Sequence, residues 1–229
     1  MLKRTKCFLF SLLFASILFN PASFSQTENS LAEKVADAYG LKAFDKVKSI
    51  SFTFNVLNKG KKTVRAWYWE PGTNKVTYKG LNKEGKEINY SYSRGATDKK
   101  DSLKSFVDAM FTNDQYWLLF PFHMVWDKKA EIVDAGTRPY PLSKKDSRCL
   151  IVKYPPDAGG YTPGDIFELY IGKDNLIHEW IYRRGGKKDG RALTWEGYKN
   201  FNGLNLSTVH NNEDKSFKLW FSGIEVLLK

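Results

Sequence analysis

A series of strand and turn patterns that recurs about every 8 to 14 residues most constrains how this chain can fold. The first strand pattern, residues 49–56, alternates strictly between polar and apolar side chains, which is typical of a strand with one wet and one buried face. Turn-forming segments such as 71–74 and 172–175 separate the later strands. Because short turns join neighbouring strands, the pattern predicts an antiparallel sheet rather than βαβ units. The predicted strands are residues 49–56, 63–70, 75–79, 87–93, 130–134, 148–154, 165–171, 176–183, 191–199, 204–210 and 216–228.

Two regions have the spacing of amphipathic helices. A capping-box pattern at Ser30 and Glu33 precedes apolar residues at helical spacing, which predicts an N-terminal helix. A second helix is predicted to begin at Ser102, and a further helical piece over residues 113–120 is expected to end at Pro121.

The predicted fold is mainly β (α+β). A sheet of about eleven strands curls because strands twist. Residues 111–126 are too apolar for a wet outer face, so we infer that they enter the concavity; a helix on the convex side is the alternative. The expected architecture is a single curved antiparallel sheet forming an incomplete barrel, with N-terminal and mid-chain helices covering or plugging its concave face. Residues 26–229 are predicted to form one domain.

Residues 1–25 have the pattern of a secretory signal peptide. A basic start precedes the apolar run 7–19, and residues 23–25 form a small-x-small cleavage site. The run is too short to span a bilayer, although an uncleaved anchor is the alternative. No cysteine follows it where a lipoprotein would carry its lipid. The mature protein is therefore expected to be periplasmic, soluble, not lipidated and monomeric, with no transmembrane segment.

The chain is basic, with a formal net charge of +11 and a pI near 9.4. Short basic runs such as 59–62 and 183–188 fall in predicted turns, so a solvated surface is the simplest interpretation. The alternative is a patch that meets an anionic surface of the cell envelope. Nucleic acid is not expected as a partner in the periplasm.

The sequence contains no motif that predicts catalysis. His123, His178 and His210 are far apart and have no metal-ligand spacing, so no metal is predicted. Nucleophile, phosphate-loop and dinucleotide patterns are absent from the sequence, so no cofactor or catalytic residue is predicted either. Cys149 lies within an apolar strand pattern and is expected to be a buried hydrophobic side chain.

A tryptophan and a glutamate are adjacent at residues 69–70, 179–180 and 195–196. Carboxylates beside aromatic rings favour a sugar-directed protein. Adjacent residues of a regular strand point to opposite faces, however, so the two members of each pair cannot share a cleft. A secreted carbohydrate-binding or glycosidase-like protein that uses surface aromatics is therefore the alternative function.

The order of these features resembles the outer-membrane lipoprotein carrier and receptor superfamily, the LolA/LolB-like fold. The resemblance rests on the signal peptide, a helix running into a strand over residues 31–56, a meander that contains segments 69–71 and 74–76, a mid-chain helix and a second antiparallel run. The chain is more similar to uncharacterised secreted relatives, which have a segment of the type 116–122, than to the carrier itself. The resemblance implies helices as a lid, and non-catalytic binding of a lipid or acylated, lipoprotein-like ligand in an apolar cavity, with an envelope carrier role.

The residues expected to line this cavity lie on the inner faces of the predicted strands and on the mid-chain helix. Period-two alternation places Arg65, Trp67 and Trp69 on one face of their strand. The full set of expected ligand-binding residues is Arg65, Trp67, Trp69, Phe106, Met110, Trp117, Phe120, Phe167, Leu169, Trp180 and Tyr182.

Overall fold

The structure, a computed structural model, describes residues 30–95, 101–157 and 162–229. The predicted signal peptide lies outside the described residues. The helices are α1 (Leu31–Ala38), α2 (Leu41–Phe44) and α3 (Ser102–Trp126), with a short 3₁₀ turn η1 (Arg184–Gly186). The strands are β1 (Val47–Asn58), β2 (Lys61–Glu70), β3 (Lys75–Leu81), β4 (Glu87–Ser93), β5 (Glu131–Pro139), β6 (Asp146–Lys153), β7 (Ile166–Ile171), β8 (Ile177–Arg183), β9 (Arg191–Thr194), β10 (Lys199–Phe201), β11 (Leu204–Leu206), β12 (Val209–Asn211) and β13 (Phe217–Leu228).

Eleven of these strands form one open, bent wall. Six are paired in the order β12-β13-β1-β2-β3-β4 and five in the order β5-β6-β7-β8-β9, while β10 and β11 form a separate hairpin. A single antiparallel bridge between Glu196 and Val209 joins the two larger sheets just after β9. The prediction of an incomplete barrel of about eleven antiparallel strands is confirmed, and the described residues form no closed barrel.

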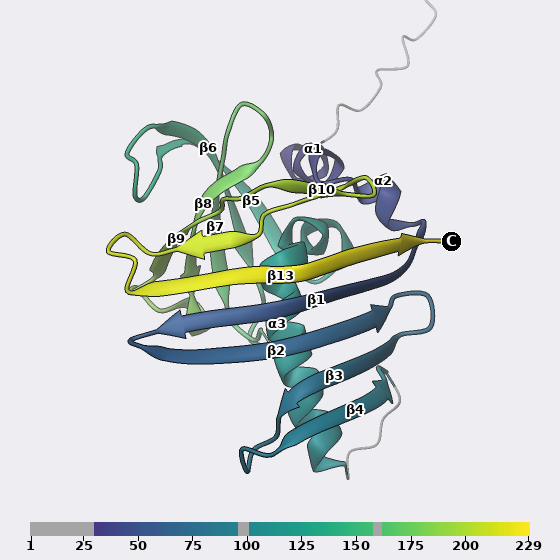
Figure 1. Cartoon of the computed structure of the whole chain (residues 1–229). Coiled ribbons are helices and arrows are strands. Elements are labelled where there is room, and N and C mark those ends of the chain that lie inside the picture. The colour runs from purple at the N-terminus through teal and green to yellow at the C-terminus, as the bar shows by residue number, and fades with distance from the viewer. Residues whose placement is uncertain (1–29, 96–100, 158–161) are drawn as a thin grey trace, which may run out of the picture.

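Helix α3 lies on the concave side of this wall, behind the six-stranded sheet in the view of Figure 1. Its Phe111 ring lies 5.3 Å from Trp67 and 5.6 Å from Trp69 of β2. Later in the helix, the centre of the Phe120 ring lies 4.5 Å from that of Phe167 of β7. The helix therefore packs against both sheets, which confirms that the mid-chain helix plugs the concavity. No helix of the described part is both long and apolar enough to cross a membrane.

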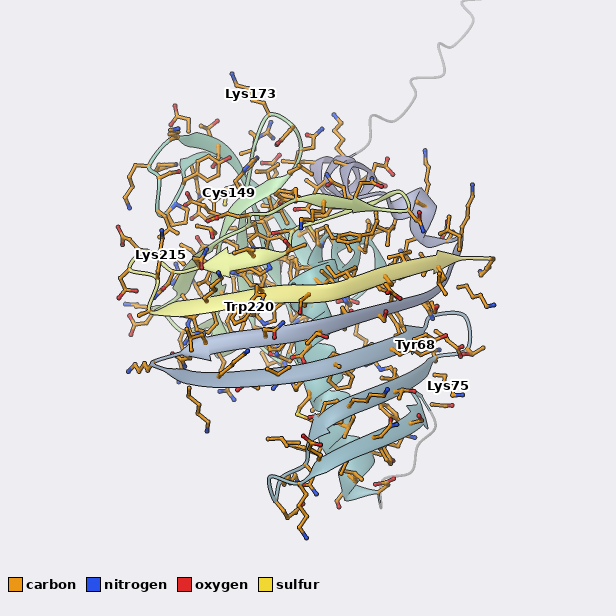
Figure 2. The ribbon with its side chains drawn as sticks, viewed as in Figure 1. Tyr68, Lys75, Cys149, Lys173, Lys215 and Trp220 are labelled. Atoms are coloured by element: carbon orange, nitrogen blue, oxygen red, sulfur yellow. The ribbon has the colours of Figure 1, made fainter. Side chains whose placement is uncertain are left out.

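The outer face of the six-stranded sheet carries the side chains that alternate along each strand with those facing α3. Tyr68 of β2 and Trp220 of β13 lie on this face, away from α3 (Figure 2). Tyr68 is 38% exposed, whereas its neighbours Trp67 and Trp69 are buried. The alternation predicted for β2 from the sequence therefore holds along its second half.

The prediction that the mid-chain helix ends at Pro121 is wrong, because α3 continues to Trp126. Proline removes one backbone donor and crowds the carbonyl four residues earlier, here that of Trp117. Pro121 is buried together with the residues on either side of it. The burial of apolar side chains over this segment outweighs the local cost of the proline.

The predicted strand over residues 191–199 is wrong in its second half, because β9 already ends at Thr194. Gly197 has φ +67°, and a Cβ there would lie 2.7 Å from Thr208 Oγ1. The chain therefore turns sharply at Gly197, and this corner is where Glu196 bridges to Val209.

The β7–β8 hairpin has the predicted aromatic face with a shifted end. The four side chains share one face, as expected from the alternation, but Phe167 is opposite Tyr182 and Leu169 is opposite Trp180. A turn at residues 172–175 predicts Ile171 opposite Leu176, so the observed pairs lie two residues further along β8 than expected. A bulge then places Ile171 opposite Ile177. The inner face of this hairpin therefore presents its rings to α3.

Candidate functional site

Two hollows beside α3 contain six of the eleven residues predicted to bind a ligand. Arg65 and Met110 line a hollow next to β2 and β3. The remaining four line a cavity between α3 and the β7–β8 hairpin, and these are Trp117, Phe167, Trp180 and Tyr182. The structure therefore divides the predicted site into two separate places.

The other five predicted residues line neither hollow. Trp67, Trp69, Phe120 and Leu169 are at most 8% exposed and belong to the hydrophobic core. Phe106 is half-buried near the start of α3, and Lys83 Nζ lies 5.1 Å from the centre of its ring. These side chains fix α3 between the sheets rather than offering a surface to a ligand.

The first hollow forms where β3 diverges from β2. The ladder between the two strands ends at the pair Ala66–Lys79, although β2 extends back to Lys61 and β3 extends on to Leu81. The space that opens between them, here called the β2–β3 hollow, has a volume of about 850 Å³. Its apolar lining is Val64, Ala66, Tyr78, Leu81, Ile88 and Met110, and its charged lining is Lys61, Lys62, Arg65, Lys79 and Glu87.

The backbone of β2 has an unpaired edge along this hollow. Lys59 and Gly60 have φ values of 48° and 78°, as in a type I′ turn, so Asn58 and Lys61 are the pair that the turn hydrogen bond closes. Because hydrogen bonding alternates along an antiparallel strand, the N–H and C=O groups of Lys62 and Val64 point away from β1. They point toward the hollow, where β3 has already diverged.

Tyr78 closes the opposite side of the hollow. Its hydroxyl donates to the Leu81 carbonyl at 2.8 Å. The ring passes over Gly80, where a Cβ would lie 2.4 Å from the Tyr78 oxygen, so only glycine fits there without a shift. Burial raises the pKa of Tyr78, which keeps the hydroxyl protonated as a donor.

A buried ion pair lies beneath this hollow. Asp114 of α3 is fully buried and accepts from Arg65 Nε at 2.6 Å and from Nη2 at 2.5 Å. Trp67 Nε1 donates to the same carboxylate at 2.8 Å. Burial raises the pKa of Asp114, and the bonds from Arg65 act in the opposite direction. This pair ties β2 to the middle of α3 and holds Arg65 in the floor of the hollow.

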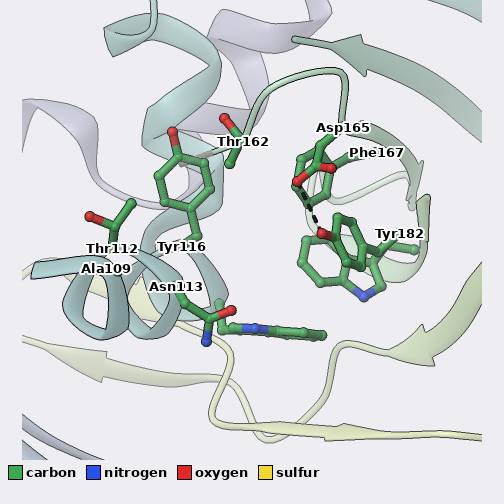
Figure 3. Close-up of a pocket in the computed structure, with 10 residues that line it drawn as sticks. Ala109, Thr112, Asn113, Tyr116, Thr162, Asp165, Phe167 and Tyr182 are labelled. Atoms are coloured by element: carbon green, nitrogen blue, oxygen red, sulfur yellow. Dashed lines mark hydrogen bonds between the residues drawn. The ribbon is translucent and has the colours of Figure 1, made fainter. Parts of the chain in front are cut away.

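The second hollow, here called the aromatic cavity, has a volume of about 190 Å³. Figure 3 shows Tyr116 and Asn113 of α3 facing Asp165, Phe167 and Tyr182 across it. Five aromatic rings line the cavity, and they belong to Tyr116, Trp117, Phe167, Trp180 and Tyr182. Ala109, Thr112, Asn113, Thr162 and Asp165 complete the lining.

Asp165 is the acidic residue of the aromatic cavity. It is 6% exposed. Its Oδ2 accepts from the Tyr182 hydroxyl at 3.0 Å, and its Oδ1 accepts from the backbone N–H of Gly185 at 2.7 Å. Burial, and then the charge of Asp165, raise the pKa of Tyr182 to about 12, so Tyr182 donates as a neutral phenol. The carboxylate is therefore fixed at the wall of the cavity.

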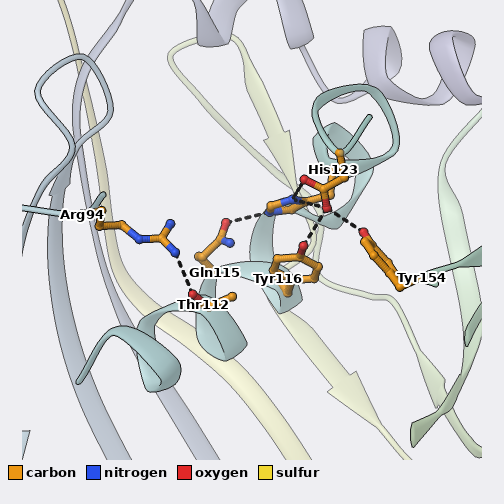
Figure 4. Close-up of polar contacts among 7 residues, drawn as sticks. Arg94, Thr112, Gln115, Tyr116, His123 and Tyr154 are labelled. Carbon is orange, nitrogen blue, oxygen red and sulfur yellow. Dashed lines mark hydrogen bonds and ion pairs between the residues drawn. The ribbon is translucent and has the colours of Figure 1, made fainter. Parts of the chain in front are cut away.

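A polar network continues from Tyr116 toward the end of α3 (Figure 4). Asp127 Oδ2 accepts from the hydroxyls of Tyr116 and Tyr154 at 2.6 and 2.7 Å. His123 contacts Asp127 Oδ2 at 3.0 Å through Nδ1 and Gln115 Oε1 at 2.9 Å through Nε2. Burial raises the pKa of Asp127, but the bonds from His123 and the tyrosines outweigh it and lower that pKa. The network fixes the orientation of Tyr116 at the cavity wall.

Sequence reasoning missed several residues of both hollows. Tyr116 and Asn113 lie in the predicted helical piece, but the sequence does not show which helix face meets β7 and β8. Lys61 and Lys62 belong to a basic run for which solvated surface is the simplest interpretation, and Lys79 stands alone at the end of a predicted strand. His123 and Asp127 are four residues apart at the end of α3, but the predicted helix ends at Pro121, so this spacing gave no signal for the polar network.

No family model and no curated protein matches this sequence. Among solved structures, the fold is similar to a LolA superfamily protein from Nitrosomonas europaea, with 8% identity, a TM-score of 0.47, and coverage of 87% of this chain and 94% of that chain. It is also similar to a DUF1329 family protein from Desulfovibrio piger, with 11% identity, a TM-score of 0.45, and coverage of 86% and 94%.

A third similar structure is a domain assigned to outer membrane lipoprotein sorting, from Vibrio parahaemolyticus. Its identity is 10%, its TM-score is 0.44, and the match covers 85% of this chain and 93% of that chain. These names agree with the resemblance expected from the sequence. At such identities the likeness concerns the fold alone.

Proposed function

We propose that this protein binds the acyl chain of an acidic lipid or acylated ligand in the β2–β3 hollow. The observation that carries the proposal is the combination of six apolar lining residues with three lysines in one hollow of about 850 Å³. Small-molecule sites typically have volumes of about 300–1,000 Å³ and a mostly apolar lining with few polar groups. The hollow fits this description, and Lys61, Lys62 and Lys79 supply the charge for an anionic head group.

The energetics favour an amphiphile over a purely polar ligand. Each methylene transferred from water to an apolar lining contributes about 0.8 kcal/mol before the cost of ordering the chain. Met110 of α3 and Ile88 of β4 are partly buried, and both line the hollow. A chain between them would cover apolar surface that is now open to water.

The proposal includes a non-catalytic role outside the cytoplasm. The leader pattern of residues 1–25 supports export to the periplasm, and the basic surface supports contact with an anionic envelope surface. The alternative function, a carbohydrate-binding or glycosidase-like protein, requires aromatic rings exposed on the surface. Trp67 and Trp180 are 3% and 1% exposed, so they present no platform on which a sugar could stack.

Binding of a fluorescent fatty acid, and its displacement by palmitate, tests the proposal. The double variant Lys61→Glu/Lys79→Glu is expected to weaken binding by about fivefold or more, because it reverses two of the lysine charges in the hollow. Ile88→Asn is expected to weaken binding by about tenfold, because it removes apolar contact.

The matched control is Lys42→Glu/Lys173→Glu, which changes the net charge equally at two exposed lysines outside the hollow. It should bind as the unchanged protein does. Failure of the unchanged protein to bind the probe would overturn the proposal. An equal loss in the control variant would also contradict it, since only net charge would then matter.

A further inference from the structure

We propose that the aromatic cavity is a second binding site, selective for a compact quaternary ammonium group such as the head of choline. The site is distinct from the β2–β3 hollow and does not depend on the function proposed there. The inference rests on the ring arrangement, the charge and the size of the cavity.

The rings form walls on two sides of the cavity. Tyr116 and Trp117 come from α3, and the other three rings come from β7 and β8. Trp117 lies 4.6 Å from Trp180 in a T-shaped contact, and Phe167 is stacked on Tyr182 at 5.0 Å. Ring faces carry negative potential, so a cation in the cavity is attracted by every ring face that it meets.

The charge of the cavity is opposite to that of the protein. The chain has a formal net charge of +11, yet Asp165 is the one charged side chain among the described residues that line the cavity. A buried carboxylate lowers the potential at this wall, which repels anions and attracts cations. A strongly basic protein thus has an acidic, aromatic interior cavity.

Three arginines lie near the cavity, and two of them contact other groups; the third, Arg184, is exposed to solvent and does not line the cavity. Arg94 donates to Thr112 Oγ1 at 2.8 Å, but Asp108 accepts from its Nε at 2.7 Å and pairs with its charge. The guanidinium of Arg191 lies 4.6 Å from the centre of the Phe217 ring. Neither residue lines the cavity, so neither fills the place of a cationic ligand.

The size of the cavity favours a compact group. A volume of about 190 Å³ corresponds to roughly six water molecules at about 30 Å³ each. A trimethylammonium head, which is a tetrahedral cluster of five heavy atoms including its linking carbon, matches this room. A long acyl chain does not, because the cavity is smaller than the usual range of about 300–1,000 Å³.

The polar lining favours a methylated over a primary ammonium. A primary ammonium carries three N–H donors, each of which needs an acceptor when it leaves water. Each oxygen of Asp165 already accepts one hydrogen bond, from Tyr182 or from Gly185, so part of the acceptor capacity of the carboxylate is used. A quaternary ammonium has no N–H to satisfy, so it requires only the rings and the fixed negative charge.

Calorimetric titration of the unchanged protein with choline, and with its neutral carbon isostere 3,3-dimethyl-1-butanol, tests the charge requirement directly. We expect choline to bind about tenfold or more tightly than the isostere. Equal affinities would overturn the proposal, since the cavity would then recognise shape and apolarity alone. Absence of choline binding at millimolar concentration would overturn it as well. Tighter binding of methylammonium than of tetramethylammonium would show that the cavity prefers primary amines, which would refute the proposal.

Variants locate the site. Tyr182→Leu is expected to weaken choline binding by about tenfold through loss of one ring. Tyr68→Leu makes the same change on the outer face of β2 and should have no effect. Lys61→Glu/Lys79→Glu should leave choline binding intact, which separates failure of this inference from failure of the acyl-chain proposal. Loss of choline binding in Tyr68→Leu, or full retention in a folded Tyr182→Leu, would place the cation elsewhere.

Discussion

The buried carboxylate of Glu179 has partners that offset its desolvation. Glu179 of β8 is 5% exposed, and its carboxylate accepts from the backbone N–H groups of Leu142 and Ser143 at 2.6 and 3.0 Å. The glutamate beside Trp180 is thus anchored to a loop on the far face of its strand, opposite the ring. This explains why a glutamate and a tryptophan adjacent in sequence do not form a sugar-binding pair here.

Residue-level expectations succeeded where they depended on strand alternation. Arg65 lies on the inner face of β2, as predicted, and Cys149 is fully buried in β6. Burial raises the pKa of the Cys149 thiol to about 11, in keeping with a hydrophobic rather than reactive role. The partner of Arg65 was not predictable, because Asp114 meets it only through the position of α3 on the sheet.

His210 should make the protein less stable as the pH falls. It is fully buried in β12, and burial lowers its pKa from 6.5 to about 3. Below pH 6.5 His210 is protonated in the unfolded chain, but it stays neutral in the folded chain down to about pH 3. The free energy of unfolding therefore decreases as the pH falls from 6.5 to about 3. The slope should approach about 1.4 kcal/mol per pH unit.

The measurement is the free energy of unfolding by urea from pH 7 to pH 5, compared between the unchanged protein and His210→Gln. Carboxyl groups titrate in both proteins, so their effect cancels in the difference. The free energy of unfolding of His210→Gln should decrease less steeply with falling pH than that of the unchanged protein. Parallel curves would mean that the pKa of His210 is the same in the folded and unfolded states, which would contradict the expectation.

Among the secondary-structure elements, α3 is the one in which tertiary packing most clearly overrides the local sequence pattern. Asp101 caps its start, accepting from Lys104 N at 2.8 Å, close to the predicted beginning. Its length could not be predicted, because the proline rule that ends a helix at Pro121 is local, whereas the burial that prolongs the helix comes from both sheets. The bulge between Tyr170 and Ile171 was hidden for the same reason, since hairpin register depends on long-range fit.

The junction of α1 and α2 should be sensitive to a single methyl group. Gly40 has φ +92°, and a Cβ there would lie 2.1 Å from the backbone oxygen of Gly203 in the β10–β11 turn. Gly40→Ala therefore adds a backbone clash to the left-handed strain, and we expect a loss of about 2 kcal/mol or more in unfolding free energy.

Gly60→Ala is the matched control for this substitution. Gly60 also has a left-handed φ, +78°, but nothing lies within 4 Å of its added Cβ. It should cost only the backbone strain of about 1 kcal/mol. Equal losses in the two variants, measured by thermal or urea unfolding, would show that the clash relaxes freely.

At the scale of the whole molecule, the candidate sites arise from how the layers meet. The β2–β3 hollow lies where two strands diverge, and the aromatic cavity lies between α3 and the β7–β8 hairpin. Alternation along each strand predicted which side chains face inward. The volumes between them depend on the placement of α3 against both sheets, which no local pattern encodes.

Hydrogen exchange should be graded across the six-stranded sheet. Strand β1 is paired on both sides, with β13 and β2, while β4 has β3 as its one partner among the strands that the structure describes. We expect amides of β1 to exchange only through global unfolding and those of β4 through local opening. Mass spectrometry of deuterated peptides measures both at once, and equally fast exchange from β1 would contradict the strand order.

The partner of β1 on one side is β13, which lies more than 150 residues later in the chain, since Asn58 is opposite Phe217. One edge of β1 therefore stays unpaired until nearly all of the remaining chain has been synthesised. Until residues 217–228 emerge, that edge is a template for pairing with other chains. A nascent chain of this fold should consequently depend on chaperones that shield open strand edges.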